Sequence, residues 1–393
     1  MKNIDLSSLK NKKIALVCSG GVVKAAAWHV GVSLALEELG FSYKTNKSVL
    51  NKTPDALEIS TLVGSSAGAL VSIFLTAGLS PQDILNSTLH MGNSSLKPVS
   101  YSDLLSVRLA HKKPRQSVVY QPFEGLPSLV RKLLMPIVNT SGLFTTVGLE
   151  NYIRKHVISS NRFEDYAADL FIVATQLDHS KKVIFSKYNY PNPAHDVTAV
   201  YQTGVNISEA AAGSMSVPPF YAPYPIISND QLTYYIDGEI RETLSTHIAI
   251  DNQCDFIISS WTHTPYHYHD EVGSLINYGL PAICLQAIYL MIQKKIVDAR
   301  EKRLTSADII NSVHEYMKSE KFSAKHTREI VSILERKLNY KPNIRLIDIY
   351  PKASNYSLFF SSAFSLNPKN SAKILKMGYR RTMEVFKNYD WQN

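Results

Sequence analysis

The 393-residue chain has few of the residues that build disulfide or zinc scaffolds. It contains only three cysteines, Cys18, Cys254 and Cys284, which are far apart in the sequence. No paired Cys/His spacing suggests structural zinc. Cys18 and Cys254 fall in apolar, strand-like segments, where a small buried hydrophobic residue is expected. The sequence therefore predicts neither a disulfide framework nor a structural metal site.

Long apolar runs are also missing. The N-terminal segment MKNIDLSSLKNKK is polar and basic, and the apolar IALVC after it is too short for a signal-peptide core. No stretch reaches the ~18 uninterrupted apolar residues of a membrane span. We expect a cytoplasmic protein that can bind peripherally to a membrane, although delivery by a route without an N-terminal signal stays open.

The charge balance points to an anionic partner. Lys and Arg number 42 against 33 Asp and Glu, which gives a net charge of +9. The positive charge is diffuse and no nucleic-acid-binding motif is present, so we expect a membrane surface and not nucleic acid. The 45% hydrophobic and 19% charged fractions are those of a globular protein with a large core. The sequence gives no oligomeric state.

Strand-like and helical segments alternate along the first part of the chain. Residues 12–18 and 58–64 read as strands, residues 24–40 and 67–78 as helices, and Ser80-Pro81-Gln82-Asp83 as a helix start with Ser as N-cap. This alternation predicts a parallel sheet covered by helices on both faces.

Two later regions differ from this pattern. Residues 92–140 lose the regularity and predict a lid or insertion within a core of residues 11–262. Residues 263–393 are mainly helical, with a late strand near 344–350, and we expect them to pack on the core. No repeat or low-complexity linker divides the chain.

The segment Gly64-Ser65-Ser66-Ala67-Gly68 fits the pattern G-x-S-x-G between a predicted strand and a predicted helix. A nucleophilic serine needs a tight strand-to-helix turn, and glycines two positions before and after it remove Cβ clashes there. The following helix directs its positive end at Ser66, where an oxyanion would form. The pattern indicates a catalytic serine, and a simple turn is the alternative.

A second turn, Ser19-Gly20-Gly21-Val22-Val23-Lys24, also lies between a strand and a helix. Its backbone N–H groups can hold an oxyanion or a phosphate. The spacing matches neither the P-loop nor the dinucleotide-binding glycine pattern. A plain strand-to-helix turn is the other interpretation.

The third motif is Tyr235-Ile236-Asp237-Gly238-Glu239, which puts a carboxylate at the end of an apolar strand. We expect Asp237 at the carboxyl edge of the sheet, where sites form in open α/β sheets. From there it could take the proton of Ser66 Oγ directly as a general base. An ordinary Asp-Gly turn is the alternative.

Taken in this order, the motifs SGGVVKAAAWHVGV, GSSAG and IDGE resemble those of the patatin-like phospholipases. These are lipid acyl hydrolases with a Ser–Asp dyad and no catalytic histidine. AAAGSMSVPPFYAP is similar to the segment before the family's aspartate strand, and RLIDIYP and KMGYRRT to its bacterial C-terminal part. The resemblance implies a three-layer α/β/α fold with a central, mostly parallel sheet and a helical C-terminal third.

The resemblance also implies roles for individual residues and a reaction without metal or cofactor. Ser66 is the expected nucleophile and Asp237 the expected base. The expected oxyanion hole consists of backbone amides at Gly20, Gly21 and Val22, supported by Lys24, Gly64, Gly68 and Gly238. The implied substrate is a membrane phospholipid or other glycerolipid, cleaved through an acyl-enzyme as by a phospholipase A or lysophospholipase.

Three positions depart from the family pattern. Family members usually have glycine where Val22 and Ala25 stand, and glycine or alanine where Glu239 stands. A valine amide can serve an oxyanion hole only if the turn tolerates a β-branched side chain. These departures keep open a non-catalytic protein that binds an anionic lipid or phosphate ligand.

Two further alternatives involve histidine. An α/β-hydrolase triad would use His247 or His263 as the base. The cluster His263, His267, His269 and Asp270 could be read as a metal site, although its spacing matches no established metal pattern.

Lipid binding could also use apolar residues of the insertion and of the proline-rich segment: Leu104, Leu105, Val118, Val119, Leu133, Leu134, Phe220, Tyr221 and Tyr224.

Overall fold

The computed structural model describes residues 4–46, 57–92, 94–107, 125, 127–130, 132, 140–190, 198–228 and 230–391. Most of the predicted insertion at 92–140 lies outside the described residues, including Val118, Val119, Leu133 and Leu134. The expected lid role of that segment therefore stays a prediction.

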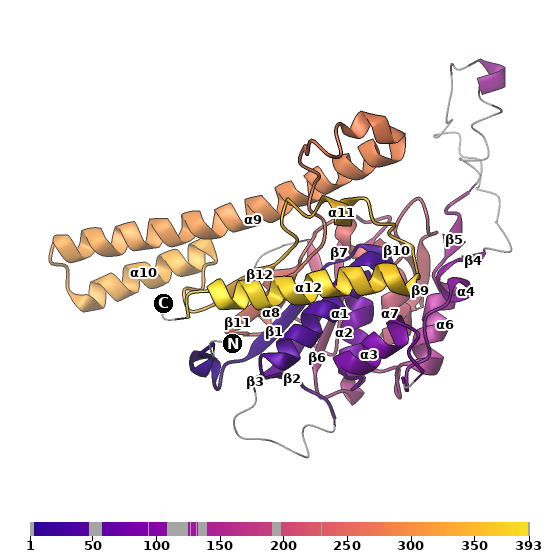
Figure 1. Ribbon diagram of the computed structural model, residues 1–393. Coiled ribbons are helices and arrows are strands. Elements are labelled where there is room, and N and C mark those ends of the chain that lie inside the picture. Colours follow the sequence, from indigo (N-terminus) through magenta and orange to yellow (C-terminus); the bar gives the residue numbers. More distant parts are fainter. Residues whose placement is uncertain are drawn as a thin grey trace.

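A ten-stranded sheet crosses the centre of the molecule (Figure 1). Its path runs β12-β11-β1-β3-β6-β10-β9, with β2 beside β3, β7 beside β6 and β8 beside β7. The strands are β1 (Ile14–Cys18), β2 (Phe41–Tyr43), β3 (Leu57–Ser65), β6 (Asp169–Gln176), β7 (Lys182–Phe185), β8 (Ala199–Gln202), β9 (Tyr224–Ser228), β10 (Gln231–Asp237), β11 (Phe256–Ser260) and β12 (Arg345–Ile349). A separate pair joins β4 (Ser106–Val107) to β5 (Phe144–Thr145).

The described helices follow the predicted apolar segments. The α-helices are α1 (Val22–Glu38), α2 (Ala67–Thr76), α3 (Pro81–Thr88), α4 (Tyr101–Leu104), α6 (Val147–His156), α7 (Ile207–Ser214), α8 (Thr246–Asp251), α9 (Gly279–Ser319), α10 (Ala324–Leu338), α11 (Tyr356–Phe359) and α12 (Pro368–Asn388). The short 3-10 helices are η1 (Ser7–Leu9), η2 (Phe163–Asp165), η3 (Gly238–Ile240) and η4 (Leu275–Tyr278). The predicted start of α3 is confirmed, since Ser80 Oγ accepts from the Asp83 N–H at 3.1 Å.

Helices cover both faces of the sheet, as expected. Along β1, Ile14, Leu16 and Cys18 belong to one hydrophobic cluster, together with α1, α2 and α12. Ala15 and Val17 point the other way, into a cluster with α8 and the middle of α9. This alternation follows from the two-residue period of a strand and confirms the three-layer architecture.

Strand β10 reaches the expected place from the other direction. Asp237 lies beside the carboxyl end of β3, as expected, but β10 runs antiparallel to β6. Strands β12, β11, β1, β3 and β6 are parallel. Strand β10 runs antiparallel to β6 and β9, and β7 runs antiparallel to β6 but parallel to β8. An apolar strand pattern carries no information about direction, so the sequence could not reveal this.

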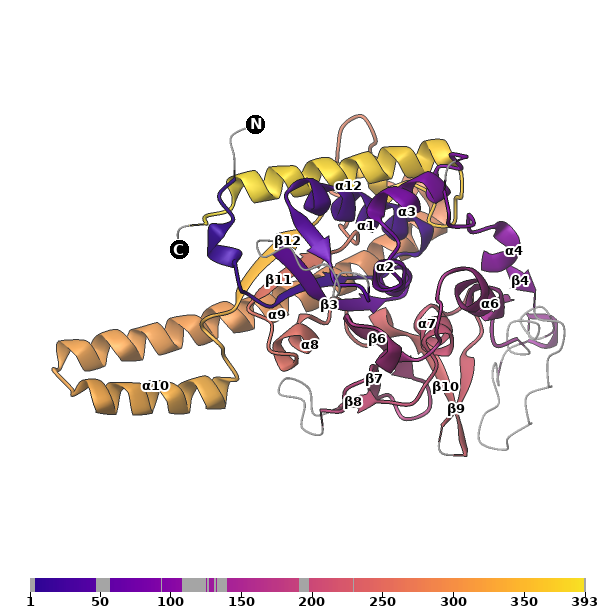
Figure 2. The same cartoon turned by 90° about the horizontal axis from the view of Figure 1, so that it is seen from below.

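The C-terminal third is built into the fold at two places. Strand β12 extends the sheet beside β11, and α12 lies along α1 (Figure 2). Gly31 of α1 and Gly378 of α12 make this close contact possible, because a Cβ at either would strike the other helix's backbone. Between β11 and β12, α9 and α10 form a hairpin that extends beyond the sheet in both views.

One described segment, Leu275–Ser319, is long and apolar enough to cross a membrane by length and composition alone. Only 11% of its most apolar window is buried. The segment contains no uninterrupted apolar run of that length, because Asn277, Gln286 and Gln293 stand among its apolar residues.

Candidate active site

Ser66 lies at the turn between β3 and α2. Its backbone has φ 52° and ψ −121°, a region that L-residues rarely adopt. Gly64 and Gly68 permit this turn: a Cβ on Gly64 would lie 2.5 Å from Ala69 Cα, and one on Gly68 would overlap the Cys18 carbonyl. Small residues therefore let α2 start directly against the end of β1, as the G-x-S-x-G pattern predicted.

Asp237 meets this turn because β3 and β10 share one flank of β6. Strand β3 pairs with β6 up to Ser65–Val173, and β10 approaches from the opposite direction and ends at Asp237–Ala174. Strand β7 occupies the other flank of β6. Two strands running head-on thus bring Asp237 beside the serine turn.

Gly238 lets these two ends come close. A Cβ there would overlap the Val173 carbonyl and lie 2.6 Å from Ser65 Oγ. The glycine after the aspartate is therefore required by packing, beyond its frequent use in turns.

The Asp237 carboxyl is buried, with 3% of its surface exposed. Burial raises its pKa to about 6, while hydrogen bonding with the Ser66 side chain and the Glu239 N–H acts in the opposite direction. The Glu239 N–H donates to Asp237 Oδ1 at 2.9 Å. The carboxylate of Asp237, which is more basic than usual, therefore contacts the Ser66 hydroxyl group directly, without a histidine between them.

The glycine-containing turn lies against Ser66. A Cβ on Gly20 would be 2.8 Å from Ser66 Cβ. Gly21 has φ 128° and Val22 has φ 58°, so the valine adopts a left-handed conformation that β-branched residues avoid. Within the described residues, no hydrogen bond uses the Gly21 or Val22 N–H, which leaves both amides available at the start of α1.

The Gly20 N–H is engaged elsewhere. It donates to Glu239 Oε1 at 2.9 Å, and a Cβ on Gly20 would lie 2.8 Å from Glu239 Cγ. Burial, together with the nearby Asp237 charge, raises the pKa of Glu239 to about 8. The departure from glycine or alanine at this position thus puts a carboxyl group on one of the three expected oxyanion amides.

Lys24 has a different environment from the one expected of a residue closing the oxyanion loop. Its buried ammonium group donates to Tyr289 Oη at 2.9 Å and to the Leu358 carbonyl at 3.1 Å. Burial lowers its pKa to about 8. Lys24 therefore ties the first turn of α1 to α9 and α11 in the C-terminal third.

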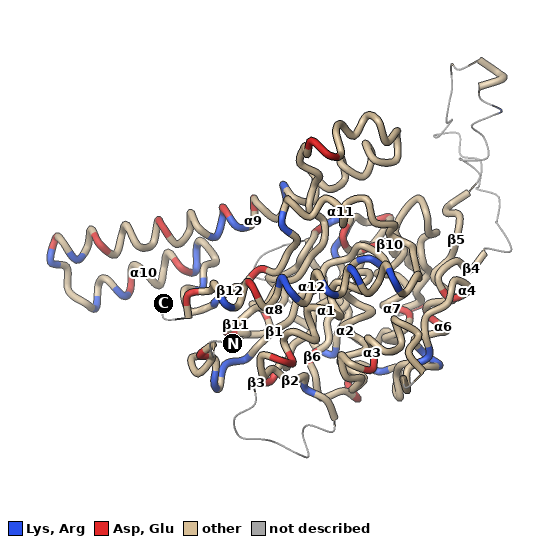
Figure 3. The backbone as a smooth tube through the Cα atoms, in the orientation of Figure 1, with Lys and Arg blue, Asp and Glu red and all other residues tan. Residues whose placement is uncertain are grey.

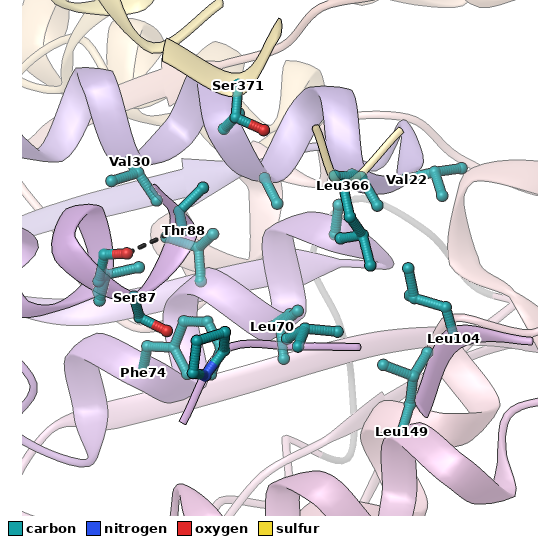
Figure 4. A pocket seen from close by; sticks show the side chains of 18 of the residues that line it. Val22, Val30, Leu70, Phe74, Ser87, Thr88, Leu104, Leu149, Leu366 and Ser371 are labelled. Atoms are coloured by element: carbon teal, nitrogen blue, oxygen red, sulfur yellow. Dashed lines mark hydrogen bonds between the residues drawn. The ribbon is translucent and has the colours of Figure 1, made fainter. Parts of the chain in front are cut away.

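An apolar pocket opens at Ser66. It encloses about 910 Å³ of empty space, part of it open to solvent. Side chains of α1, α2, α3, α4 and α6 converge on it, together with Leu366 before α12 (Figure 4). Among the residues that line it are Val22, Leu70, Phe74, Leu104, Leu149 and Tyr221. A long hydrocarbon chain matches this lining better than a polar ligand does.

Of the residues suggested for lipid binding, Leu104 and Tyr221 line the pocket. No sequence motif pointed to Ser214, the last residue of α7. Its Oγ accepts the Ser66 N–H at 2.8 Å and donates to the Val173 carbonyl at 2.6 Å. The hydroxyl therefore links the serine turn to β6, a contact that only the folded chain brings about.

The two histidines proposed as a base have neighbours other than Ser66. His247 forms an ion-pair network with Glu242 and Lys182. His263 is buried behind the glycine turn, where its Nε2 lies 3.4 Å from a Cβ built on Gly21, and burial lowers its pKa to about 3. Within the described ranges, no three His, Cys, Asp or Glu side chains form a metal-binding group.

The fold and the site together define an α/β protein with a serine turn and a buried aspartate beside it. A family model of the patatin-like phospholipases matches residues 16–250, so the chain belongs to this family of lipid acyl hydrolases. Among solved structures, VipD from Legionella pneumophila is similar, with 15% identity, coverage of 96% of this chain and 67% of VipD, and a TM-score of 0.41. No curated protein sequence matches the chain.

Proposed function

We propose that the protein hydrolyses carboxylic esters of membrane glycerolipids through Ser66 and Asp237. The observation that carries this proposal is the apolar pocket that opens at Ser66. A serine on a strained turn, in contact with a carboxyl group and at the end of a hydrocarbon-lined pocket, suits the attack on a fatty acyl ester.

In the proposed reaction, Asp237 takes the proton from Ser66 Oγ as that oxygen attacks the ester carbonyl carbon. The N–H groups of Gly21 and Val22 stabilise the oxyanion of the tetrahedral intermediate. When the C–O bond breaks, Asp237 returns the proton to the leaving alcohol and an acyl-enzyme remains. Asp237 then deprotonates water as its oxygen attacks the acyl carbonyl. When the bond between Ser66 Oγ and the acyl carbon breaks, Asp237 returns the proton to Oγ and the fatty acid leaves.

The test is fatty-acid release from phospholipid vesicles with EDTA present. We expect Ser66→Ala and Asp237→Asn to lower the rate by about a thousandfold or more, since removing either reacting group disables the dyad. Ser72→Ala is the matched control. It removes from α2, the helix that begins directly after Ser66, a buried hydroxyl group that makes no hydrogen bond to the described residues, and it should keep full activity.

An active Asp237→Asn protein would contradict the dyad. Loss of activity in a His247→Ala or His263→Ala protein alone would favour the triad instead. Circular dichroism of each variant shows whether the fold is intact.

A further inference from the structure

The first half of α9 has an apolar face on the outside of the molecule. Its inner side is marked by the buried residues Tyr289, Ile292 and Ile296. Surface helices normally carry polar residues opposite such a stripe. Here the exposed side is apolar, and we call it the α9 apolar face: Leu280, Ile283, Cys284, Ile288 and Met291, with Ile276 of η4.

The charge pattern around this face is uneven. Residues 272–293 contain no Asp, Glu, Lys or Arg, and the corresponding part of the tube in Figure 3 is uncharged. Lys294 follows directly, with its side chain 72% exposed beside Asp298, whereas Lys295 turns inward and donates to the Ile240 carbonyl at 2.9 Å. An uncharged apolar helix face that ends at an exposed lysine, on a chain of net charge +9, suits an anionic lipid surface.

The inner side of the same helix reaches the catalytic region. Tyr289 accepts a hydrogen bond from Lys24 at 2.9 Å and packs edge-on against His263, with ring centroids 5.2 Å apart. Both partners lie next to the glycine turn at Ser66. The α9 apolar face is therefore carried by a helix fixed to the site. Because Tyr289 on its inner side is buried in the protein, this arrangement suits a helix that lies on a membrane surface and not one that crosses it.

We propose that the α9 apolar face docks the protein on an anionic phospholipid surface. Leu280, Ile283 and Met291 enter the boundary between headgroups and acyl chains, and the exposed Lys294 contacts lipid phosphates. This inference rests on the proposed function in one respect: it takes the membrane as the place where the substrate lies.

The experiment is vesicle flotation in a Ser66→Ala background, which prevents hydrolysis during binding. The vesicles contain phosphatidylcholine with phosphatidylserine. We expect the combined Leu280→Ser, Ile283→Ser and Met291→Ser protein to bind about tenfold or more weakly, because buried apolar area sets the affinity of interfacial helices. The matched control is Ile227→Ser with Leu232→Ser, which removes two exposed apolar residues from the β9–β10 hairpin and should bind normally.

A second readout separates docking from catalysis. With Ser66 intact, the triple variant should hydrolyse a short-chain ester in solution at the normal rate and vesicle lipid slowly. If the triple substitution weakens vesicle binding but the protein with Ser66 intact hydrolyses no ester, this inference stands and the proposed function is contradicted. Unchanged vesicle binding of the triple variant would overturn the inference, as would a dimer that becomes monomeric in this variant without losing vesicle binding.

A separate observation concerns Glu239. Its Oε1 accepts the Gly20 N–H, its stem packs against Gly20, and Oε2 is buried without a recorded hydrogen bond. The titratable group that acts on it is Asp237, and the hydroxyl groups of Ser65 and Thr243 face it. Two carboxyl groups in one buried site retain a proton more readily than isolated ones do, and they titrate as a pair.

We propose that Glu239 is a positioning residue that, in its neutral form, holds the oxyanion loop against Ser66 through the Gly20 amide. With Asp237 charged and Glu239 protonated, the pair carries a single negative charge. When Glu239 also ionises, a second negative charge stands beside the developing oxyanion and slows the reaction. This too rests on the proposed function.

Glu239→Gln and Glu239→Ala test this role on a soluble ester. Because glutamine keeps the acceptor for Gly20 but cannot ionise, we expect a kcat at pH 7 within about threefold of the parent and no loss of rate around pH 8. The alanine protein should lose about tenfold in kcat, since the Gly20 amide loses its partner. Two results would overturn the inference. One is a Glu239→Gln protein that loses rate around pH 8 as the parent does, and the other is a Glu239→Ala protein that is as active as the parent.

Discussion

At the scale of single residues, the site combines two strained backbones. Ser66 and Val22 have φ values of 52° and 58°, and they lie on the two turns that meet at the pocket. Strain of this kind costs roughly 1–3 kcal/mol per residue and persists where surrounding structure enforces it. For Ser66 the conformation presents the hydroxyl group, whereas for Val22 a glycine would adopt it more easily.

Replacing Val22 with glycine should therefore not destabilise the protein as a helix glycine usually does. We expect a free energy of unfolding that is unchanged or about 1 kcal/mol higher, because relief of strain offsets the entropy of glycine. Val23→Gly, one residue further along α1 and without a positive φ, should lose about 1 kcal/mol. Urea unfolding of both proteins checks this, and equal losses would contradict the strain at Val22.

The Asp237 pKa sets the acid side of the activity profile. As the proposed base, Asp237 works only when ionised, and burial raises its pKa to about 6. We therefore expect kcat/KM for a soluble ester to fall about tenfold per pH unit below about 6 and to reach its plateau between this value and the loss of rate expected around pH 8. A profile still flat at pH 5 would contradict this assignment.

The sequence motifs pointed to Ser66 and Asp237 because Ser66 stands between Gly64 and Gly68, and Asp237 ends an apolar strand before Gly238. The contact of Glu239 with Gly20 could not be predicted, since 219 residues separate them. The same holds for Ser214, whose hydroxyl reaches the Ser66 amide only after α7 has packed on β6. Local spacing pointed to the proposed reacting groups, and tertiary packing supplied the residues that hold them.

At the scale of elements, apolar periodicity predicted most strands and helices near their observed bounds. It missed the direction of β10, which decides how Asp237 meets Ser66. It also missed the short β2 and β8, since three- and four-residue strands leave little pattern. Glycine spacing within helices was equally uninformative, although Gly31 and Gly378 set how closely α1 and α12 pack.

Gly378→Ala tests this helix packing. The new Cβ would lie 2.5 Å from the Trp28 carbonyl oxygen, so the helices must separate. We expect a loss of about 1–3 kcal/mol in the free energy of unfolding, as for other overpacked contacts. Gly92→Ala is the control, because nothing lies within 4 Å of its added Cβ. Thermal and urea unfolding give the comparison, and equal stability of the two variants would contradict the close contact.

At the scale of the whole molecule, the predicted boundary at residue 262 between the core and the C-terminal part stays a prediction. It follows a change in sequence pattern, but residues on both sides of it belong to one sheet and one hydrophobic cluster. Strand β12 completes the sheet beside β11, and Ile374, Leu375 and Phe386 of α12 belong to the main hydrophobic cluster. Only the outer part of the α9–α10 hairpin extends away from these contacts (Figure 1).

Two shortened chains separate these roles. We expect residues 1–262 alone to be insoluble, because the apolar surface under α12 would be exposed. A chain in which a short glycine–serine linker replaces residues 307–337 should stay soluble, with a cooperative thermal transition, since the hairpin's outer helices pack mainly on each other. Soluble yield and differential scanning calorimetry measure both. A stable, soluble 1–262 protein would contradict this view of the C-terminal third.

The contacts of Lys24 with the segment before α12 also have a consequence for the timing of synthesis. Lys24 in the first turn of α1 donates its backbone N–H to the Ala363 carbonyl and its ammonium group to the Leu358 carbonyl. A ribosome makes the serine, the aspartate and the glycine turn long before these carbonyls exist. Domains that fold during translation usually do so from the N-terminus. Here the nascent chain lacks both contacts at its glycine turn until residues 358–363 have left the ribosome, so we expect the site to be complete only after that point.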